Sequence, residues 1–254
     1  MRDASSGEVL AAREQDSVLS IASVGKLLLL VEAARAIEEG DLDPGTLLAR
    51  AEADRVADSG LWQDLGVDAL PAADVAALVG AFSDNLATNV LLRHLGLERV
   101  AATAAALGLR RTALHDRVRD VRGPDDPPRL ASGTAGELSR LLAELFAGRP
   151  AASGLVRGWL SRNADLSMVP AALGLDPLAH AADRGLRLRN KTGTDAGVRA
   201  DAGLLAGPLG AVAYAVVANW DEGERRDEVL AAMARVGRRL AVAVTESPPS
   251  TASP

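Results

Sequence analysis

The sequence lacks cysteine altogether and holds only three histidines, His94, His115 and His180. The missing thiol excludes disulfides, thiolate metal sites and a cysteine nucleophile, and it leaves the redox compartment open. No two histidines are spaced i, i+4, so the helical zinc motif of metallohydrolases is absent as well. We therefore expect a protein that works without a metal or any other cofactor.

Charge and hydropathy exclude two further classes of protein. The 254 residues include 28 basic and 34 acidic side chains, a net charge of -6, which argues against a nucleic-acid or anionic-membrane partner bound through bulk charge. No apolar run, Leu27 to Val31 included, is long enough to span a membrane, and the first residues contain no apolar segment of signal-peptide length. As written, the chain predicts a cytoplasmic protein of one large or two small domains.

Lysine is nearly absent too. Of the 28 basic residues 26 are arginine, and only Lys26 and Lys191 are lysine. A GC-rich coding bias replaces surface lysine by arginine, but it spares sites that need a compact ammonium or one that gives up its proton. Either the two lysines survived by chance or they are candidates for chemistry.

Apolar spacing and Gly/Pro punctuation predict strands at both ends of the chain and helices between them. The expected strands are Gly7–Ala12, Ser17–Ile21, Leu186–Lys191, Ala200–Leu205 and Gly210–Asn219. The expected helices are Lys26–Glu39, Pro71–Ala81, Asn85–His94, Glu98–Leu107, Ala135–Phe146 and Arg226–Val244. The charged, proline-containing segment 110–133 predicts a long loop of the kind that is usually functional.

This order predicts a discontinuous α/β domain, residues 1–22 and 175–245, around an inserted, mostly helical domain, residues 23–174. An active-site groove is expected at their junction. The Ser/Pro/Thr-rich tail, residues 246–254, is expected to be disordered.

Ser23 and Lys26 stand one helical turn apart where the buried helix is expected to begin. A hydroxyl and an ammonium at this spacing can share a proton, and a helix N-terminus stabilises a developing alkoxide. The pair therefore suits a serine nucleophile and its base. The alternative is a plain helix start with a serine N-cap, which by itself is the more common arrangement.

Two more motifs occur further along the chain. Ser83–Asn85 (Ser-Asp-Asn) lies where one expected helix gives way to the next, a place where N-cap residues are common. Lys191–Thr194 (Lys-Thr-Gly-Thr) lies at the end of an expected strand. Its glycine either lets another backbone or a ligand approach closely or simply turns the chain.

The set Ser-x-x-Lys, Ser-Asp-Asn and Lys-Thr-Gly, in this order, resembles the motif set of class A β-lactamases and penicillin-binding proteins. Both lysines fall inside it, and the resemblance runs from about Ser6 to Val244. It implies a mixed α/β (α+β) fold, in which an antiparallel sheet flanked by helices holds an inserted all-helical domain. It also implies a serine hydrolase that forms an acyl-enzyme.

The resemblance assigns a role to each catalytic residue. Ser23 is implied as the acylated nucleophile, Lys26 as its base or proton shuttle, and Ser83 as the relay that protonates the leaving lactam nitrogen. Asn85 is implied to hold Lys26 and the amide of the substrate side chain. The backbone N–H groups of Ser23 and Thr194 are implied as the oxyanion hole.

The strand motif is implied to bind the substrate. Lys191 would fix Ser83 and the substrate carboxylate, Thr192 would donate to that carboxylate, and Gly193 and Thr194 would line the site. Arg199 matches an arginine that binds the carboxylate in several relatives, as guanidinium does well. In a chain with 26 arginines an exposed strand residue is an equal alternative.

The loop that activates the deacylating water departs from the class A pattern. Relatives have a glutamate and an asparagine there, but this chain has neither from Arg99 to Gly136, and the glutamate position falls near Val118 or Arg119. The candidate bases that remain are few, and all are equally compatible with a solvated surface loop: His115, Asp116 and Asp120.

The start of the chain departs as well. Relatives have a helix and a first strand before the segment that matches Gly7–Ala12, and we expect neither here. Either an edge strand is missing, or the true start lies upstream and includes an export signal, in which case the protein is secreted or periplasmic.

Three functions stay open at this point. The favoured one is a monomeric β-lactamase-like hydrolase whose partner is a small β-lactam or acyl substrate with a carboxylate, with slow deacylation because the loop glutamate is missing. The second is a D,D-peptidase or small-ester hydrolase on the same fold. The third is a non-hydrolysing β-lactam binder or biosynthetic relative.

Overall fold

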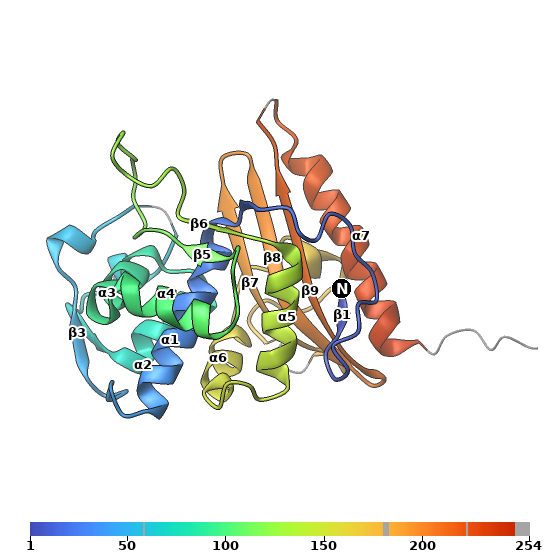
Figure 1. Cartoon of the computed structure of the whole chain (residues 1–254), viewed down its shortest axis with the longest axis horizontal. Coiled ribbons are helices and arrows are strands. Elements are labelled where there is room, and N and C mark those ends of the chain that lie inside the picture. Colours follow the sequence, from blue (N-terminus) through green and yellow to red (C-terminus); the bar gives the residue numbers. More distant parts are fainter. Residues whose placement is uncertain (58, 180–182, 222, 247–254) are drawn as a thin grey trace, which may run out of the picture.

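A computed structural model describes residues 1–254 except 58, 180–182, 222 and 247–254. Its centre is an antiparallel sheet with the strand order β1-β9-β8-β7 (Figure 1). The strands are β1 (Arg2–Asp3), β7 (Arg187–Asp195), β8 (Val198–Gly207) and β9 (Gly210–Asn219). Both ends of the chain thus build one sheet, although its N-terminal strand, β1, was not among the predicted ones. The predicted tail lies outside the described residues apart from Glu246.

Strand β8 is buried on both sides because helices cover both faces of the sheet. Ala202 and Leu204 pack in the core cluster shared with α5 (Ala135–Phe146), whereas Leu205 packs in the cluster shared with α7 (Arg226–Thr245). Alternate residues of a strand point to opposite faces, so the two helices lie on opposite sides of the sheet. The predicted mixed α/β class, an antiparallel sheet flanked by helices, is confirmed.

The remaining helices gather beside the sheet around α1 (Lys26–Glu38), as Figure 1 shows. The run Leu27–Val31 is completely buried, because α2, α3, α4 and α6 enclose this helix. Their bounds are Ala72–Phe82, Asn85–Leu95, Leu97–Ala106 and Ser153–Leu160. No helix of the described part is long and apolar enough to cross a membrane.

The predicted strand Gly7–Ala12 is wrong, and so is the expectation that no strand precedes it. β1 pairs with the edge of β9, with Arg2 opposite Ala213. The Asp3 carboxylate then accepts hydrogen bonds from the next two serines, and Gly7 adopts a φ of 77°. This turn folds the chain back, and Val9 makes a single bridge to Arg2.

The shorter elements were largely missed or misplaced by the sequence. The predicted strand Ser17–Ile21 shrinks to β2 (Leu19–Ser20), which pairs with β6 (Ala131–Gly133) and through it with β5 (Ala113–Leu114). The predicted loop 110–133 therefore begins and ends in strands. Several short elements of the described chain were not predicted. They include the helix α6 and an antiparallel pair of strands, β3 (Leu47–Ala49) and β4 (Ala69–Pro71). They also include the 3₁₀ turns η1 (Ala22–Gly25), η2 (Glu52–Asp54), η3 (Trp62–Asp64) and η4 (Val169–Ala172).

Candidate active site

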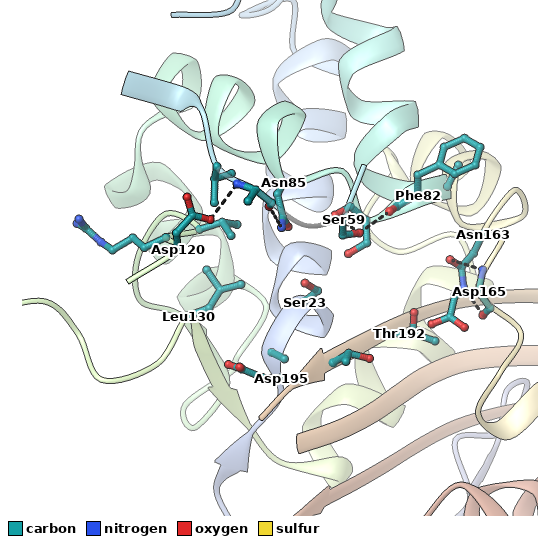
Figure 2. Close-up of a pocket in the computed structure, with 18 of the residues that line it drawn as sticks. Ser23, Ser59, Phe82, Asn85, Asp120, Leu130, Asn163, Asp165, Thr192 and Asp195 are labelled. Atoms are coloured by element: carbon teal, nitrogen blue, oxygen red, sulfur yellow. Dashed lines mark hydrogen bonds between the residues drawn. The ribbon is translucent and has the colours of Figure 1, made fainter. Parts of the chain in front are cut away.

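Ser23 lies in the 3₁₀ turn η1, which leads directly into α1. The preceding Ala22 has a φ of 43°, a left-handed conformation that costs free energy in a non-glycine residue and is held by the surrounding packing. On the other side of the turn, a Cβ at Gly25 would overlap the methyl group of Ala131. The serine is thereby fixed on a tightly packed turn, half-buried, at the wall of a pocket (Figure 2).

Strand β7 passes directly beside this turn because Gly193 has no side chain. A Cβ at Gly193 would overlap the carbonyl oxygen of Ile21 and would lie 3.1 Å from the backbone nitrogen of Ser23. The predicted close approach at this glycine is confirmed. Ser23 is at the start of a helical turn, where N–H groups have no helical partner, and Thr194 lines the same pocket.

Lys26 is completely buried beneath the pocket. Its ammonium donates to the carbonyl oxygen and the hydroxyl of Ser83, at 2.7 and 3.3 Å, and to Oδ1 of Asn85 at 2.7 Å. Two motifs separated by more than fifty residues thus meet at one nitrogen. The sequence predicted these residues separately, and the structure brings them together.

The conformation of Ser83 makes this contact possible. Ser83 ends α2 with a φ of 54°, and the next residue, Asp84, begins α3 as its N-cap by accepting from the N–H of Ala87 at 2.8 Å. Asp84 also accepts from the N–H groups of Leu61 and Trp62, at 2.7 and 2.8 Å. The simple N-cap interpretation of this motif therefore holds for the aspartate, while its two neighbours face Lys26.

The pocket in front of Ser23 has a volume of about 840 Å³ and is built from six parts of the chain. Figure 2 shows Ser23 between Asp120 on one side and Thr192, Asn163 and Asp165 on the other. The six parts are the turn η1, residues 56, 57 and 59, the junction of α2 with α3, the loop 118–130, the segment 163–165 and the end of β7.

Lys191 is completely buried in β7, and its ammonium donates to the carbonyl oxygen of Thr192 at 2.8 Å. Burial lowers the pKa of Lys191 to about 8, although the charges of Asp165 and Asp201 act to raise it. Among the described residues, Lys191 makes no hydrogen bond to Ser83, in contrast to the role that the resemblance implied. Strand β7 continues to Asp195, so the motif lies within the strand rather than at its end.

Arg199 is next to the pocket but does not line it. Its guanidinium donates to the carbonyl oxygens of Asp195 and Val198, at 3.1 and 2.7 Å, and lies 5.9 Å from the ring centre of Trp220. Carboxylate binding by Arg199 stays a prediction, and it requires the side chain to turn away from these partners.

The loop of candidate bases is ordered by its own charges. Burial acts to raise the pKa of Asp116, but hydrogen bonds from Arg119 and Arg122 lower it below its usual value. His115 makes a 2.8 Å hydrogen bond to Ser132, and neither His115 nor Asp116 lines the pocket. Asp120 does line it and accepts from the N–H of Ala57 at 2.8 Å.

Val118 stands at the pocket wall, where the sequence placed the missing glutamate. The polar residues of the pocket that the sequence did not predict include Ser59, Asn163 and Asp165. Ser59 donates to the carbonyl oxygen of Phe82 at 3.0 Å. No motif marks these residues, and only the packing of distant segments places them beside Ser23.

Both the sequence and the fold of the chain resemble those of known proteins. The model of the Beta-lactamase enzyme family matches residues 1–244, and the chain belongs to this family. No curated protein matches the sequence.

Solved structures share the fold at low sequence identity. A β-lactamase from Sphaerobacter thermophilus is 23% identical with a TM-score of 0.78, and the match covers 93% of this chain and 87% of that one. An acyl-enzyme complex of a PBP-A variant with penicillin G is 24% identical, with a TM-score of 0.76 and coverages of 94% and 87%. A variant of the last common ancestor of Gram-negative class A β-lactamases is 24% identical, with a TM-score of 0.76 and coverages of 95% and 91%.

Proposed function

We propose that the protein is a serine hydrolase that is acylated at Ser23 by β-lactams and releases the acyl group slowly. The observation that carries this proposal is the ammonium of Lys26, which is bound at once to Ser83 and Asn85 next to the nucleophile turn. A buried cation with these partners is more than a helix start requires, and it is suited to proton transfer.

In this proposal Lys26 reacts as the neutral amine. The hydroxyl oxygen of Ser23 attacks the lactam carbonyl carbon while the amine nitrogen of Lys26 takes the hydroxyl proton and becomes an ammonium, which then supplies the proton that Ser83 passes on. The oxyanion that forms accepts hydrogen bonds from the N–H groups of Ser23 and Thr194. The C–N bond of the lactam then breaks, and the nitrogen receives a proton through Ser83. The product is an ester on Ser23 with an opened ring.

We expect the substrate carboxylate to be held at the end of the pocket that strand β7 forms. Lys191 supplies the charge, and the hydroxyls of Thr192 and Thr194 supply donors at the pocket surface. Arg199 adds a second charge if it turns toward the ligand. This end of the pocket gives the preference for a small acyl substrate with a carboxylate.

Release of the acyl group requires a base that aims a water molecule at the ester. Val118 has no group for this task, and Asp116 is engaged by two arginines. Asp120 is the carboxylate on this loop that lines the pocket. We therefore expect hydrolysis of the ester to be the slow step.

The deciding experiment is intact-mass spectrometry after mixing with penicillin G, with Ser23→Ala as the control. An adduct of one penicillin on the wild type, absent from Ser23→Ala, supports the proposal, and an adduct retained by the variant contradicts it. Stopped-flow absorbance with a chromogenic cephalosporin should show a burst before a slow steady state. A linear trace with fast turnover and no adduct would mean that another base, Asp120 first, assists deacylation.

A second candidate function is a D,D-peptidase or small-ester hydrolase, and the apolar Val118 favours it over efficient β-lactam turnover. Release of D-alanine from a muropeptide, dependent on Ser23, would support this function. A penicillin adduct that persists without D-alanine release or ester hydrolysis would instead indicate a non-hydrolysing binder.

A further inference from the structure

Asp201 is a completely buried carboxylate in the middle of strand β8. Its Oδ1 accepts hydrogen bonds from Asn190 Nδ2 at 3.0 Å and from the hydroxyl of Tyr214 at 3.1 Å, and its Oδ2 accepts from the N–H of Val169 at 3.1 Å. All three donors are neutral. Asp201 forms no ion pair with any described residue, which is a costly arrangement for a buried carboxylate.

The absence of a side chain at Gly203 makes room for these hydrogen bonds. Asn190, Gly203 and Tyr214 lie side by side in register on three neighbouring strands. A Cβ at Gly203 would lie 2.6 Å from that of Asn190 and 2.7 Å from the hydroxyl oxygen of Tyr214. The missing side chain therefore lets the tyrosine hydroxyl and the asparagine reach the same carboxylate.

The hydrogen bonds continue from Asp201 to the wall of the pocket. Asn190 accepts from Asn163 Nδ2 at 2.9 Å, and the same nitrogen donates to the carbonyl oxygen of Asp165 at 3.1 Å. Both asparagines are buried, whereas Asp165 lines the pocket close to Thr192 (Figure 2). The segment 163–165 is thus tied to the sheet through two asparagine side chains.

The carboxylate of Asp201 also lies beside strand β7, which carries Lys191 and Thr192. Asn190 directly precedes Lys191, and Thr192 is the register partner of Asp201. Strand β7 and the segment 163–165 are the two walls at this end of the pocket. A single buried group therefore connects both of them.

We propose that Asp201 is a positioning residue whose carboxylate, through Asn190 and Asn163, holds strand β7 and the segment 163–165 in the arrangement that binds the substrate carboxylate. This inference rests on the proposed function, in which Lys191 and Thr192 form the carboxylate site. Asp201 does not touch the substrate. It acts through the groups that do.

The charge of Asp201 gives this role a measurable signature. Burial raises the pKa of Asp201 to about 7, against the hydrogen bonds from Asn190, Val169 and Tyr214, and the charge of Asp165 raises it further. The charge of Asp201 in turn acts to raise the pKa of Lys191, while helix α7 contributes apolar side chains to this face of the sheet. A protonated Asp201 turns one oxygen into a donor, so one of its three partners loses an acceptor.

The test separates substrate binding from the chemical step. For Asp201→Asn, we expect the dissociation constant of a carboxylate-bearing penicillin to rise about tenfold near pH 7.5, while the acylation rate constant at saturation changes less than about twofold. The wild type should show a similar loss of affinity between about pH 7.5 and pH 6, and the variant should not, because its amide does not titrate. An uncharged ester should bind equally well to both proteins.

Two further variants distinguish positioning from general stability. Tyr214→Phe removes one donor from Asp201, so the pH at which affinity changes should move upward. Glu32→Gln neutralises another completely buried carboxylate, bound to Arg35 and Thr103 away from the pocket, and serves as the matched control. It should lower the free energy of unfolding without changing penicillin affinity or its pH dependence.

Equal affinity losses for the penicillin and the ester, or an Asp201→Asn variant that keeps the wild-type affinity at both pH values, would overturn the inference. A penicillin adduct that never forms on the wild type would refute the proposed function instead. In that case the link from Asp201 through Asn190 to Asn163 is still tested by the side-chain amide resonances of the two asparagines. These resonances should shift between about pH 6 and pH 7.5 in the wild type but not in Asp201→Asn. Unchanged resonances in the wild type would refute the link between Asp201 and the two asparagines.

Discussion

The side chain of Asn89 holds the backbone of Val118 by two hydrogen bonds. Its Nδ2 donates to the carbonyl oxygen of Val118 at 3.0 Å, and its Oδ1 accepts from the N–H of Val118 at 2.8 Å. Asn89 is buried in α3, so this point of the loop is fixed against the helical part of the molecule. The loop therefore presents a defined position to the pocket, and the residue type at that position decides what chemistry the loop supplies.

Val118→Glu should speed deacylation. A carboxylate at this fixed position can act as the missing base, and general-base assistance contributes about 10²–10⁴-fold. The lifetime of the penicillin adduct, followed by intact mass, should shorten by at least about tenfold. Val121→Glu is the matched control, because Val121 is on the same loop, 82% exposed and outside the pocket lining. Equal lifetimes in both variants would mean that position 118 does not face the ester.

Lys26→Arg should lower the acylation rate by about 10²-fold or more although the positive charge is kept. A guanidinium stays protonated, so it cannot accept the proton of Ser23. The rate of fluorescent-penicillin labelling measures this, and thermal unfolding checks that the buried site tolerates the larger group. Near-normal labelling would show that Lys26 acts through its charge alone.

Gly193→Ala should damage acylation more than it damages the fold. The added methyl group would overlap the carbonyl oxygen of Ile21, so β7 must move away from the Ser23 turn and widen the proposed oxyanion hole. Losing one oxyanion donor costs about 10²–10³-fold in rate. Gly154→Ala is a useful control because a Cβ there meets nothing within 4 Å. Similar labelling rates in both variants would argue against the close approach.

Arg199→Ala tests the second carboxylate anchor. If the guanidinium leaves Trp220 to bind substrate, its removal should weaken acylation by carboxylate-bearing β-lactams by about one to two decades, equivalent to roughly 1.5–3 kcal/mol, and spare an uncharged ester. Labelling kinetics with both substrates give the comparison. Equal losses would assign Arg199 to the hairpin between β7 and β8, whose carbonyl oxygens it binds.

The lowered pKa of Lys191 predicts opposite pH effects on binding and on stability. As pH rises through about 8 the ammonium loses its proton, so the affinity for carboxylate substrates should fall. The unfolded chain binds more protons at this site between about pH 8 and the ordinary lysine value, so the contribution of Lys191 to the free energy of unfolding rises there by at most about 1.4 kcal/mol per pH unit. Denaturant unfolding of the wild type and Lys191→Met across this range measures that contribution, and a difference independent of pH would contradict it.

The long elements of this fold could be predicted from the sequence because their signals are local. The helix from Lys26 is predicted by its apolar first turns and by the glycine that follows its end. Helix α5 is predicted with its observed bounds, Ala135–Phe146. The short strands could not be found this way. A strand such as β1 has only two residues, and it exists because β9 offers it a partner.

The catalytic set divides in the same manner. Three short motifs that contain both lysines resemble those of a known family, and this resemblance named Ser23, Lys26, Ser83 and Lys191 as candidates. The approach of Lys26 and Ser83 to the Ser23 turn depends on backbone conformations that no motif contains, such as the positive φ angles of Ala22 and Ser83.

The groups behind the site were decided by tertiary structure alone. Asp201 gains its neighbours Asn190 and Tyr214 from strand register, and Asn163 reaches Asn190 only because the segment after α6 packs against the sheet. Burial then shifts the pKa of Asp201, since the free energy of a charge depends on how much water remains around it. The sequence specified which functional groups are present, and the packing of distant segments determined their neighbours and their charge.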